Sequence, residues 1–91
     1  MRESAFSDHL TKLLAKLSKK DRTRYHATLK KIEEILTCEN IDHYKNLRAP
    51  LQHLKRVHID SSFVLTFRFD KNDDTVYFYD LDHHDRIYRA P

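Results

Sequence analysis

The last third of the chain alternates between apolar and polar positions in three short runs. The runs are 55–59, 63–69 and 75–79, and all three are rich in β-branched and aromatic residues. The segments 60–62 and 70–74 between them consist of Asp, Ser, Lys and Asn, most of which favour turns. Alternation with a period of two residues, interrupted by such turns, predicts an antiparallel β-meander.

The strand register follows from keeping charged side chains out of an apolar face. A three-residue loop at 60–62 places Ile59 opposite Phe63, whereas a shorter loop would set Arg56 and His58 among phenylalanines. With a four-residue second loop, one face is apolar and the other carries arginine, histidine and tyrosine. This second face ends beside His83, His84 and Tyr88. The apolar face comprises Val57, Ile59, Phe63, Leu65, Phe67, Phe69, Val76 and Phe78, and the opposite face Arg56, His58, Val64, Thr66, Arg68, Tyr77 and Tyr79.

Two amphipathic helices are predicted in the N-terminal half. Apolar residues recur at spacings of three and four, and Ser7 or Asp8 is placed to cap the first helix. The segment 18–21 resembles a capping box between the two helices. The two stripes are Phe6, Leu10, Leu13, Leu14 and Leu17, and then Tyr25, Leu29, Ile32, Ile35 and Leu36.

The expected fold is therefore α+β. Two N-terminal antiparallel helices pack on one face of a small twisted antiparallel β-sheet, because the apolar face of the sheet needs such a cover. Residues 1–91 form a single domain, since no linker is long enough to divide them. The pattern leaves open whether a short strand near residues 3–6 precedes the first helix.

Composition narrows the class of protein. The chain is 40% hydrophobic and 34% charged, which is typical of a folded domain. It has no apolar run of ~18 residues and no apolar signal core at its start, so we expect a cytoplasmic protein without a membrane span. The lone Cys38 agrees with a reducing compartment. A modest excess of basic over acidic residues, 17 to 14, permits a polyanionic partner without requiring one.

Without glycine the chain cannot form the usual phosphate-binding loop, and the histidines remain as the residues that could carry chemistry. One interpretation is a metal site. His58, Asp82, His83, His84 and Asp85 could meet at the end of the sheet. However, adjacent residues of a strand point to opposite faces, so His83 and His84 could share an ion only across a bend. We therefore expect neither a metal nor another cofactor.

The other interpretation is acid–base chemistry on a polyanion. A histidine near its ordinary pKa of ~6.5 can exchange a proton at neutral pH. Arginines can hold a phosphate and stabilise its developing charge, and a tyrosine can stack on a base. Cleavage of RNA by its own 2′-hydroxyl needs only such a set. The same residues also fit an ordinary polar surface, and their composition alone does not decide between the two.

Two segments, 54–68 and 82–88, resemble the C-terminal half of the RelE/ParE toxin superfamily, and the two predicted helices have the right order. The similarity is greatest to the histidine-using branch typified by YafQ and to archaeal members. It implies a microbial RNase fold and a ribosome-dependent mRNA endonuclease, the toxin of a type II toxin–antitoxin pair. Such toxins cut mRNA in the ribosomal A site through attack of the 2′-hydroxyl, without a metal.

The resemblance also implies roles for individual positions. His58 matches the histidine that opens the first hairpin turn, His84 the histidine near the C-terminus, and Tyr88 the aromatic position four residues later. Asp60 matches an acidic turn residue. The functional aspartate of that branch falls at Ser62, so Asp60 would have to substitute for it.

The expected catalytic residues are His58, His84, Tyr88, Asp60 and Arg68, and the expected RNA-binding residues are Lys55, Arg56, Arg86 and His83. The expected partners are a cognate antitoxin protein and mRNA in the ribosomal A site, with no membrane. Two other functions stay open: a non-enzymatic, ParE-like toxin that inhibits gyrase, and an inactive RNA-binding module of the same fold.

Overall fold

A computed structural model describes residues 1–88, with the exception of the Tyr88 side chain. The elements are β1 (Glu3–Phe6), α1 (Asp8–Lys20), α2 (Arg22–Thr37), β2 (Lys55–His58), β3 (Phe63–Asp70), β4 (Thr75–His83) and α3 (His84–Tyr88), with a short 3-10 turn at Ile41–His43. No helix in these residues is long and apolar enough to cross a membrane.

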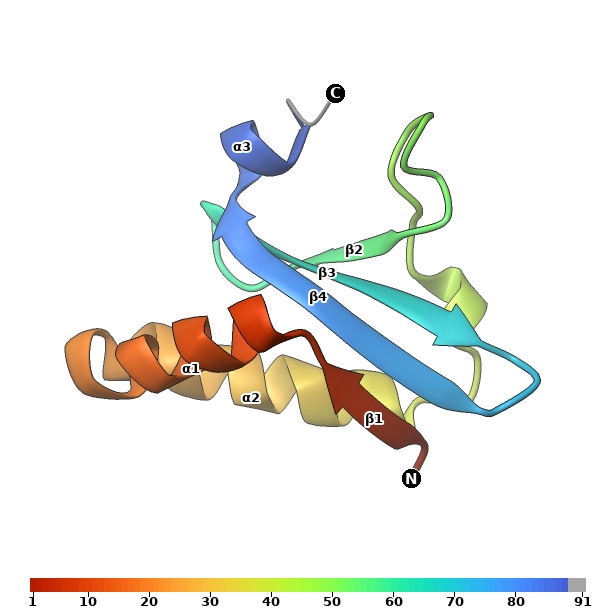
Figure 1. Ribbon diagram of the computed structural model, residues 1–91, viewed down its shortest axis with the longest axis horizontal. Coiled ribbons are helices and arrows are strands. Elements are labelled where there is room, and N and C mark those ends of the chain that lie inside the picture. Colours follow the sequence, from red (N-terminus) through yellow and green to blue (C-terminus); the bar gives the residue numbers. More distant parts are fainter. Residues whose placement is uncertain (89–91) are drawn as a thin grey trace.

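The molecule is built in two main layers. Figure 1 shows α1 and α2 side by side under one face of the sheet, with α3 and the loop before β2 on the other side. The strand order is β1-β4-β3-β2, in which the β2–β3 and β3–β4 pairs are antiparallel and β1 is parallel to β4. The expected α+β fold is confirmed. The strand that the sequence left open, β1, makes the sheet mixed instead of wholly antiparallel.

The first long helix begins where the sequence indicated, whereas the second begins after Asp21 and not at a capping box of residues 18–21, because Ser18 still belongs to α1. Ser7 caps α1, because its Oγ accepts a hydrogen bond from the Leu10 N–H at 3.0 Å. Asp21 caps α2 by accepting a hydrogen bond from the Arg24 N–H at 3.1 Å. Each cap stabilises its helix by about 1 kcal/mol, because it pairs a backbone donor that would otherwise lack a partner. Asp21 alone separates the two helices, so the chain reverses there sharply.

The buried stripe of α2 matches the prediction at Ile32, Ile35 and Leu36 but contains Thr28 in place of Leu29. Thr28 is fully buried, whereas Leu29 is 38% exposed. Thr28 tolerates burial because its hydroxyl donates a hydrogen bond to the Arg24 carbonyl at 2.8 Å. The stripe that faces the sheet therefore runs through Thr28, Ile32 and Ile35.

The predicted strand register is confirmed. Val57 pairs with Leu65 and His58 with Val64, and the turn between Asp70 and Thr75 has the expected four residues. The main core therefore lies between the apolar face and the two long helices, as expected. Its buried members are Leu10, Ile32, Ile35, Leu36, Ile41, Tyr44, Leu65, Phe67, Val76, Phe78 and Leu81.

A β-bulge in the β3–β4 pair was not predicted. Thr66 pairs with Asp80 but Phe67 pairs with Phe78, so Tyr79 is an extra residue on β4. The extra residue shifts the alternation of the strand, and both Phe78 and Leu81 reach the core. The bulge thereby determines which face of the sheet each of the last residues of β4 projects from.

The face of the sheet that turns away from α1 and α2 has a small apolar cluster of its own. Val64 is buried there together with Leu47 from the loop before β2 and Ile87 from α3. The sequence did not predict α3, because five residues are too few to show a helical period. This cluster holds the loop and α3 over the sheet beside the predicted site.

Candidate functional site

The end of the sheet near α3 gathers two of the predicted histidines. His58 ends β2 and pairs with Val64, which in turn pairs with Asp82 on β4. Paired residues project from the same face, so His58 and Asp82 both face away from the long helices, with their Cα atoms about 10 Å apart. His84 comes two residues after Asp82, and its backbone N–H donates a hydrogen bond to the Ser62 carbonyl at 2.8 Å. This bond fixes the start of α3 against the turn that follows His58.

A bend between β4 and α3 brings two adjacent histidines to one side. His83 ends the strand and His84 begins the helix, and their ring centroids are 4.6 Å apart. The Asp85 carboxylate reaches both rings, with Oδ1 3.0 Å from His84 Nδ1 and Oδ2 3.6 Å from His83 Nδ1. Within residues 1–88, these are the side chains whose spacing could hold a metal ion.

Asp60 shapes the turn between β2 and β3. Its Oδ1 accepts hydrogen bonds from the N–H groups of Ser62 and Phe63, both at 2.8 Å, and its Oδ2 accepts one from Arg24 Nε at 3.0 Å. Burial by itself acts to raise the pKa of Asp60, but these hydrogen bonds and the charge of Arg24 lower it below its ordinary value. The carboxylate is therefore engaged in holding the turn, and its contacts do not support the expected catalytic role.

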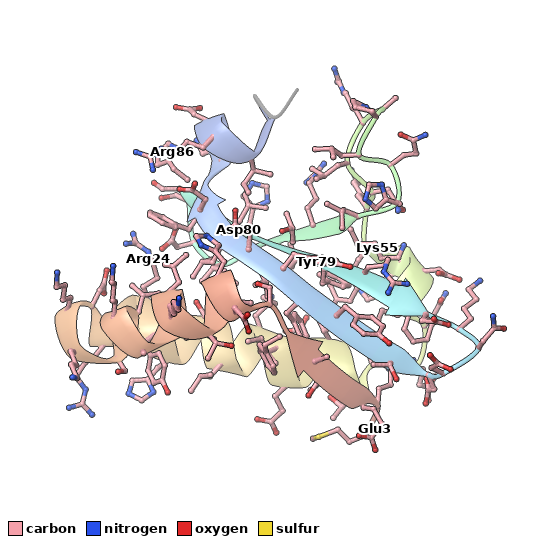
Figure 2. The ribbon with its side chains drawn as sticks, in the orientation of Figure 1. Glu3, Arg24, Lys55, Tyr79, Asp80 and Arg86 are labelled. Atoms are coloured by element: carbon pink, nitrogen blue, oxygen red, sulfur yellow. The ribbon has the colours of Figure 1, made fainter. Side chains whose placement is uncertain are left out.

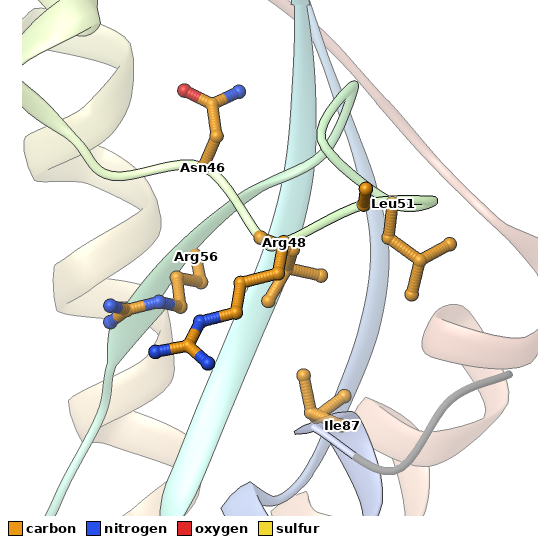
Figure 3. Close-up of a pocket in the computed structure, with 7 residues that line it drawn as sticks. Asn46, Arg48, Leu51, Arg56 and Ile87 are labelled. Atoms are coloured by element: carbon orange, nitrogen blue, oxygen red, sulfur yellow. The ribbon is translucent and has the colours of Figure 1, made fainter.

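A cleft of about 530 Å³ lies between α3 and the loop before β2. Its lining combines apolar side chains, such as Leu51 and Ile87, with the guanidinium groups of Arg48 and Arg56. Figure 3 shows these two guanidinium groups side by side, apart from Leu51. Paired guanidinium groups suit a phosphate, and the apolar lining suits the face of a nucleotide base. The cleft therefore has the chemistry of a nucleotide-binding site.

Arg48 was not among the predicted site residues. It lies in an irregular segment before β2, where no periodicity indicates the direction of a side chain. The one signal in the sequence was its place between Leu47 and Pro50, in a loop with an apolar anchor. Only the packing of Leu47 against Val64 and Ile87 brings Arg48 to Arg56.

Lys55 does not join this site. The residue is only 9% exposed, and its Nζ donates hydrogen bonds to the Tyr44 carbonyl and to Asn46 Oδ1, both at 3.1 Å. Figure 2 shows Lys55 well away from Arg86, which lies on α3. To reach a phosphate, the ammonium group would have to leave these partners unpaired, which is unfavourable for a buried carbonyl. The expected RNA-binding role of Lys55 is therefore not supported.

Arg68 also lies away from the histidines. It pairs with Tyr77, and it is four residues beyond Val64 on β3, roughly 13 Å by the rise of a strand. Its guanidinium group stacks 4.4 Å above the Tyr77 ring, and its Nε donates a hydrogen bond to the Tyr79 hydroxyl at 3.3 Å. The face shared by Arg68 and the two tyrosines was predicted correctly, but this position does not support a catalytic role for Arg68.

The remaining predicted residues lie at the sheet end. Arg56 comes two residues before His58 on β2 and lines the cleft. Arg86 is exposed on α3, with its NH1 3.7 Å from Asp82 Oδ1. Tyr88 is the last residue of α3, and its side chain falls outside the described part of the chain. The structure thus gathers His58, His83, His84, Arg56 and Arg86 at one end of the sheet, where Asp60 holds the adjoining turn, and it leaves Lys55 and Arg68 apart.

One relative in sequence covers almost the whole chain. Over 89 residues the chain is 55% identical to the "Putative toxin RelE4" of Methanocaldococcus jannaschii, and the alignment covers 98% of this chain and 93% of that protein. No protein-family model matches the chain.

Several solved structures have the same fold at low sequence identity. The metal-bound toxin from Helicobacter pylori matches with a TM-score of 0.76 and 20% identity, over 96% of this chain and 99% of its own. The E. coli RelBE toxin–antitoxin complex contains a chain that matches with a TM-score of 0.71 and 18% identity, over 91% of this chain and 96% of its own. YafQ from E. coli matches with a TM-score of 0.67 and 14% identity, over 97% of this chain and 99% of its own.

Proposed function

Because the chain belongs to the RelE superfamily of toxins, we propose that it is a ribosome-dependent mRNA endonuclease, the toxin of a type II toxin–antitoxin pair. Its substrate is mRNA in the ribosomal A site, which it cleaves in the cytoplasm. The reaction is attack of a 2′-hydroxyl on the adjacent phosphate, and it uses side chains of the protein for proton transfer.

The observation that carries this proposal is the pair of histidines at one end of the sheet. His58 and the start of α3 at His84 flank the same turn, and the arginine-edged cleft lies on the same side of the sheet. Two imidazoles and several guanidinium groups at one end of the sheet make up the set that RNA cleavage needs. A polar surface without chemistry would not require that these groups share one end of the sheet.

The chemistry consists of two proton transfers around one displacement. One imidazole takes the proton of the 2′-hydroxyl, and the 2′-oxygen then bonds to phosphorus. The bond from phosphorus to the 5′-oxygen breaks, and the second imidazole gives a proton to that oxygen. The products are a 2′,3′-cyclic phosphate and a 5′-hydroxyl. Arg48, Arg56 and Arg86 stabilise the negative charge on the phosphate oxygens, and Tyr88 stacks on or orients the substrate.

A translation extract programmed with a defined mRNA tests the reaction. Primer extension should reveal cuts in phase with codons, and His58→Ala and His84→Ala should each lower the cleavage rate by about 100-fold or more, because each removes a proton-transfer group. His26→Ala is the matched control, because His26 is exposed on α2, in the layer that lies under the other face of the sheet.

Uncut mRNA with the unaltered chain would refute the endonuclease. A supercoiling assay with purified gyrase would then distinguish the other two functions. Loss of supercoiling would indicate a gyrase-inhibiting toxin, and intact supercoiling would leave an inactive RNA-binding module. Equal cleavage by His84→Ala and the unaltered chain would retain the activity but refute the assigned site.

We also propose that an antitoxin protein covers the sheet end. Complexes of this kind are known for the fold, as in E. coli RelBE. Arginines edge the cleft, and the chain has a net charge of +3, so an acidic segment would bind it favourably. Co-expression with the product of the neighbouring gene should give a stable complex that abolishes cleavage. The same complex with Arg48→Glu and Arg56→Glu should be weaker, and unchanged affinity would place the antitoxin elsewhere.

A further inference from the structure

We propose that His83, His84 and Asp85 bind one divalent transition-metal ion of the zinc class, and that the bound ion inhibits the toxin. The inhibition rests on the proposed function, because it assumes that His84 transfers a proton during RNA cleavage. The metal site itself rests on geometry alone.

The bend at the end of β4 removes the obstacle that two adjacent histidines normally meet. Within a strand, His83 and His84 would project from opposite faces. Here the strand ends at His83 and α3 begins at His84, so the two rings lie 4.6 Å apart with an angle of 31° between their planes. Asp85, in the first turn of α3, then places one carboxylate within reach of both rings.

The distances between the donor atoms are close to those of a coordinated ion. Zinc lies about 2.0–2.1 Å from imidazole nitrogen and carboxylate oxygen, so two of its ligands stand roughly 3.0–3.5 Å apart. The Nδ1 atoms of His84 and His83 are 3.0 and 3.6 Å from the two oxygens of Asp85. All three donor atoms lie within 4.8 Å of one another. Small rotations of side chains would bring them around one ion.

The hydrogen bond that His83 accepts suits a side chain that coordinates a metal ion. Its Nδ1 accepts a hydrogen bond from the Asp85 N–H at 3.3 Å, so this nitrogen carries a lone pair. Neutral imidazole nitrogen together with a carboxylate is a donor set that zinc and nickel bind well. The Phe63 ring, packed edge-on against His83 at 5.9 Å, holds that imidazole in place.

The site is open to solvent on one side. The side chains of His83, His84 and Asp85 are 40%, 37% and 59% exposed, and a concavity of about 420 Å³ borders His83 and Asp85. Three protein ligands would leave a fourth position of the ion open to water. An ion can therefore enter without local unfolding of the chain.

Occupancy would inhibit cleavage through His84. A metal ion bound to Nδ1 occupies the place of a proton on the ring and fixes the orientation of the ring, so His84 can no longer take up a proton and deliver it to RNA. Zinc thus acts as an inhibitor here and takes no part in the cleavage.

Isothermal titration calorimetry with zinc chloride tests the site independently of RNA. The unaltered chain should bind one ion, and His83→Ala and Asp85→Asn should each weaken that binding roughly tenfold or more, because each loses one of three ligands. His26→Ala and His53→Ala are matched controls, since both histidines are exposed and neither belongs to the cluster. Circular dichroism should show that the exposed substitutions leave the fold intact.

Equal zinc binding by the unaltered chain, His83→Ala and Asp85→Asn would overturn the site, whatever the protein does to RNA. Zinc binding that depends on both residues would establish it, even if no RNA is cut. In the cleavage assay, zinc at a concentration just above the dissociation constant of the unaltered chain should then inhibit the unaltered chain more strongly than His83→Ala. If both are inhibited equally, the inhibitory role is wrong and the binding site stands.

Discussion

Lys55 and Arg56 are adjacent on β2, and the alternation of the strand gives them opposite environments. The Lys55 ammonium is buried against Tyr44 and Asn46, whereas Arg56 lines the cleft next to Arg48. Charge and position in the sequence are nearly the same for both residues. What differs is the face of the strand, which decides whether a basic side chain stabilises the fold or is presented to a ligand.

Lys55→Met tests this assignment. The free energy of unfolding should fall by about 2 kcal/mol, because the Tyr44 carbonyl and the Asn46 side chain lose a charged donor. The cleavage rate per folded molecule should not change, because Lys55 does not reach the RNA. Urea unfolding followed by circular dichroism gives the first quantity. Lys16→Met, on the exposed surface of α1, is the control. Normal stability together with lost cleavage in Lys55→Met would contradict the assignment.

The Asp60 carboxylate should make stability depend on pH. Its pKa is lower in the folded chain than its ordinary value of 3.8, so its contribution is fully present above that value and is lost as the pH falls through the folded pKa. Asp60→Asn keeps an acceptor for the turn but loses the charge that pairs with Arg24. It should be less stable than the unaltered chain at pH 7, and the difference should shrink as the pH falls below 3.8. Thermal unfolding across pH 2–7 measures this, and a difference that stays constant with pH would exclude the ion pair as its cause.

Among the elements, α3 depends most on its surroundings. A helix of five residues is not stable alone, and the buried Ile87 is what attaches it to Val64 and Leu47. The backbone bond from His84 to Ser62 fixes its start. The position of His84 and Arg86 is therefore set by one apolar contact and one hydrogen bond.

Ile87→Ala should release α3 from the sheet. Cleavage should fall by about tenfold or more, because His84 and Arg86 lose their fixed positions. Global stability should change less than for a truncation in the main core, because detachment of one short helix limits the loss. Leu36→Ala, in that core, is the comparison: it should lower stability further while the folded fraction still cleaves RNA. Hydrogen exchange at α3 would show the detachment directly, and unchanged protection there in Ile87→Ala would count against this account.

At the scale of the whole molecule, one face of the sheet is buried in the main core and the other is open to ligands. One face is covered by α1 and α2 and forms the main core, while the other carries His58 and the cleft. The many lysines on the two long helices lie in the layer away from the cleft (Figure 1). For RNA binding, the location of the positive charges should therefore matter more than their total number.

The salt dependence of RNA binding checks this division. For a single-stranded RNA oligonucleotide, Arg48→Ala and Arg56→Ala should each weaken binding and reduce the slope of log K against log salt by about 0.7, the share of one phosphate contact. Lys16→Ala and Lys20→Ala remove the same charge from exposed positions of α1 and should leave the slope unchanged. Fluorescence anisotropy between 50 and 200 mM salt gives these slopes. Equal effects of all four substitutions would indicate that RNA binds through overall charge.

The sequence by itself determined the elements and the sidedness of the sheet. Apolar spacing predicted both long helices. The alternation in the runs 55–59 and 63–69 predicted how these two strands pair, and it placed His58 on the face away from the helices. These features are local, because the period of a strand or a helix is written in consecutive residues.

Only the tertiary structure decided which charged residues meet. Arg48 reaches Arg56 because Leu47 and Ile87 pack on Val64, and His83 and His84 share one side because a strand ends between them. Arg68 stays with its tyrosines because its position along β3 is fixed by pairing with β4. Contacts between segments distant in sequence depend on packing and chain direction, and neither leaves a periodic signal in the residues concerned.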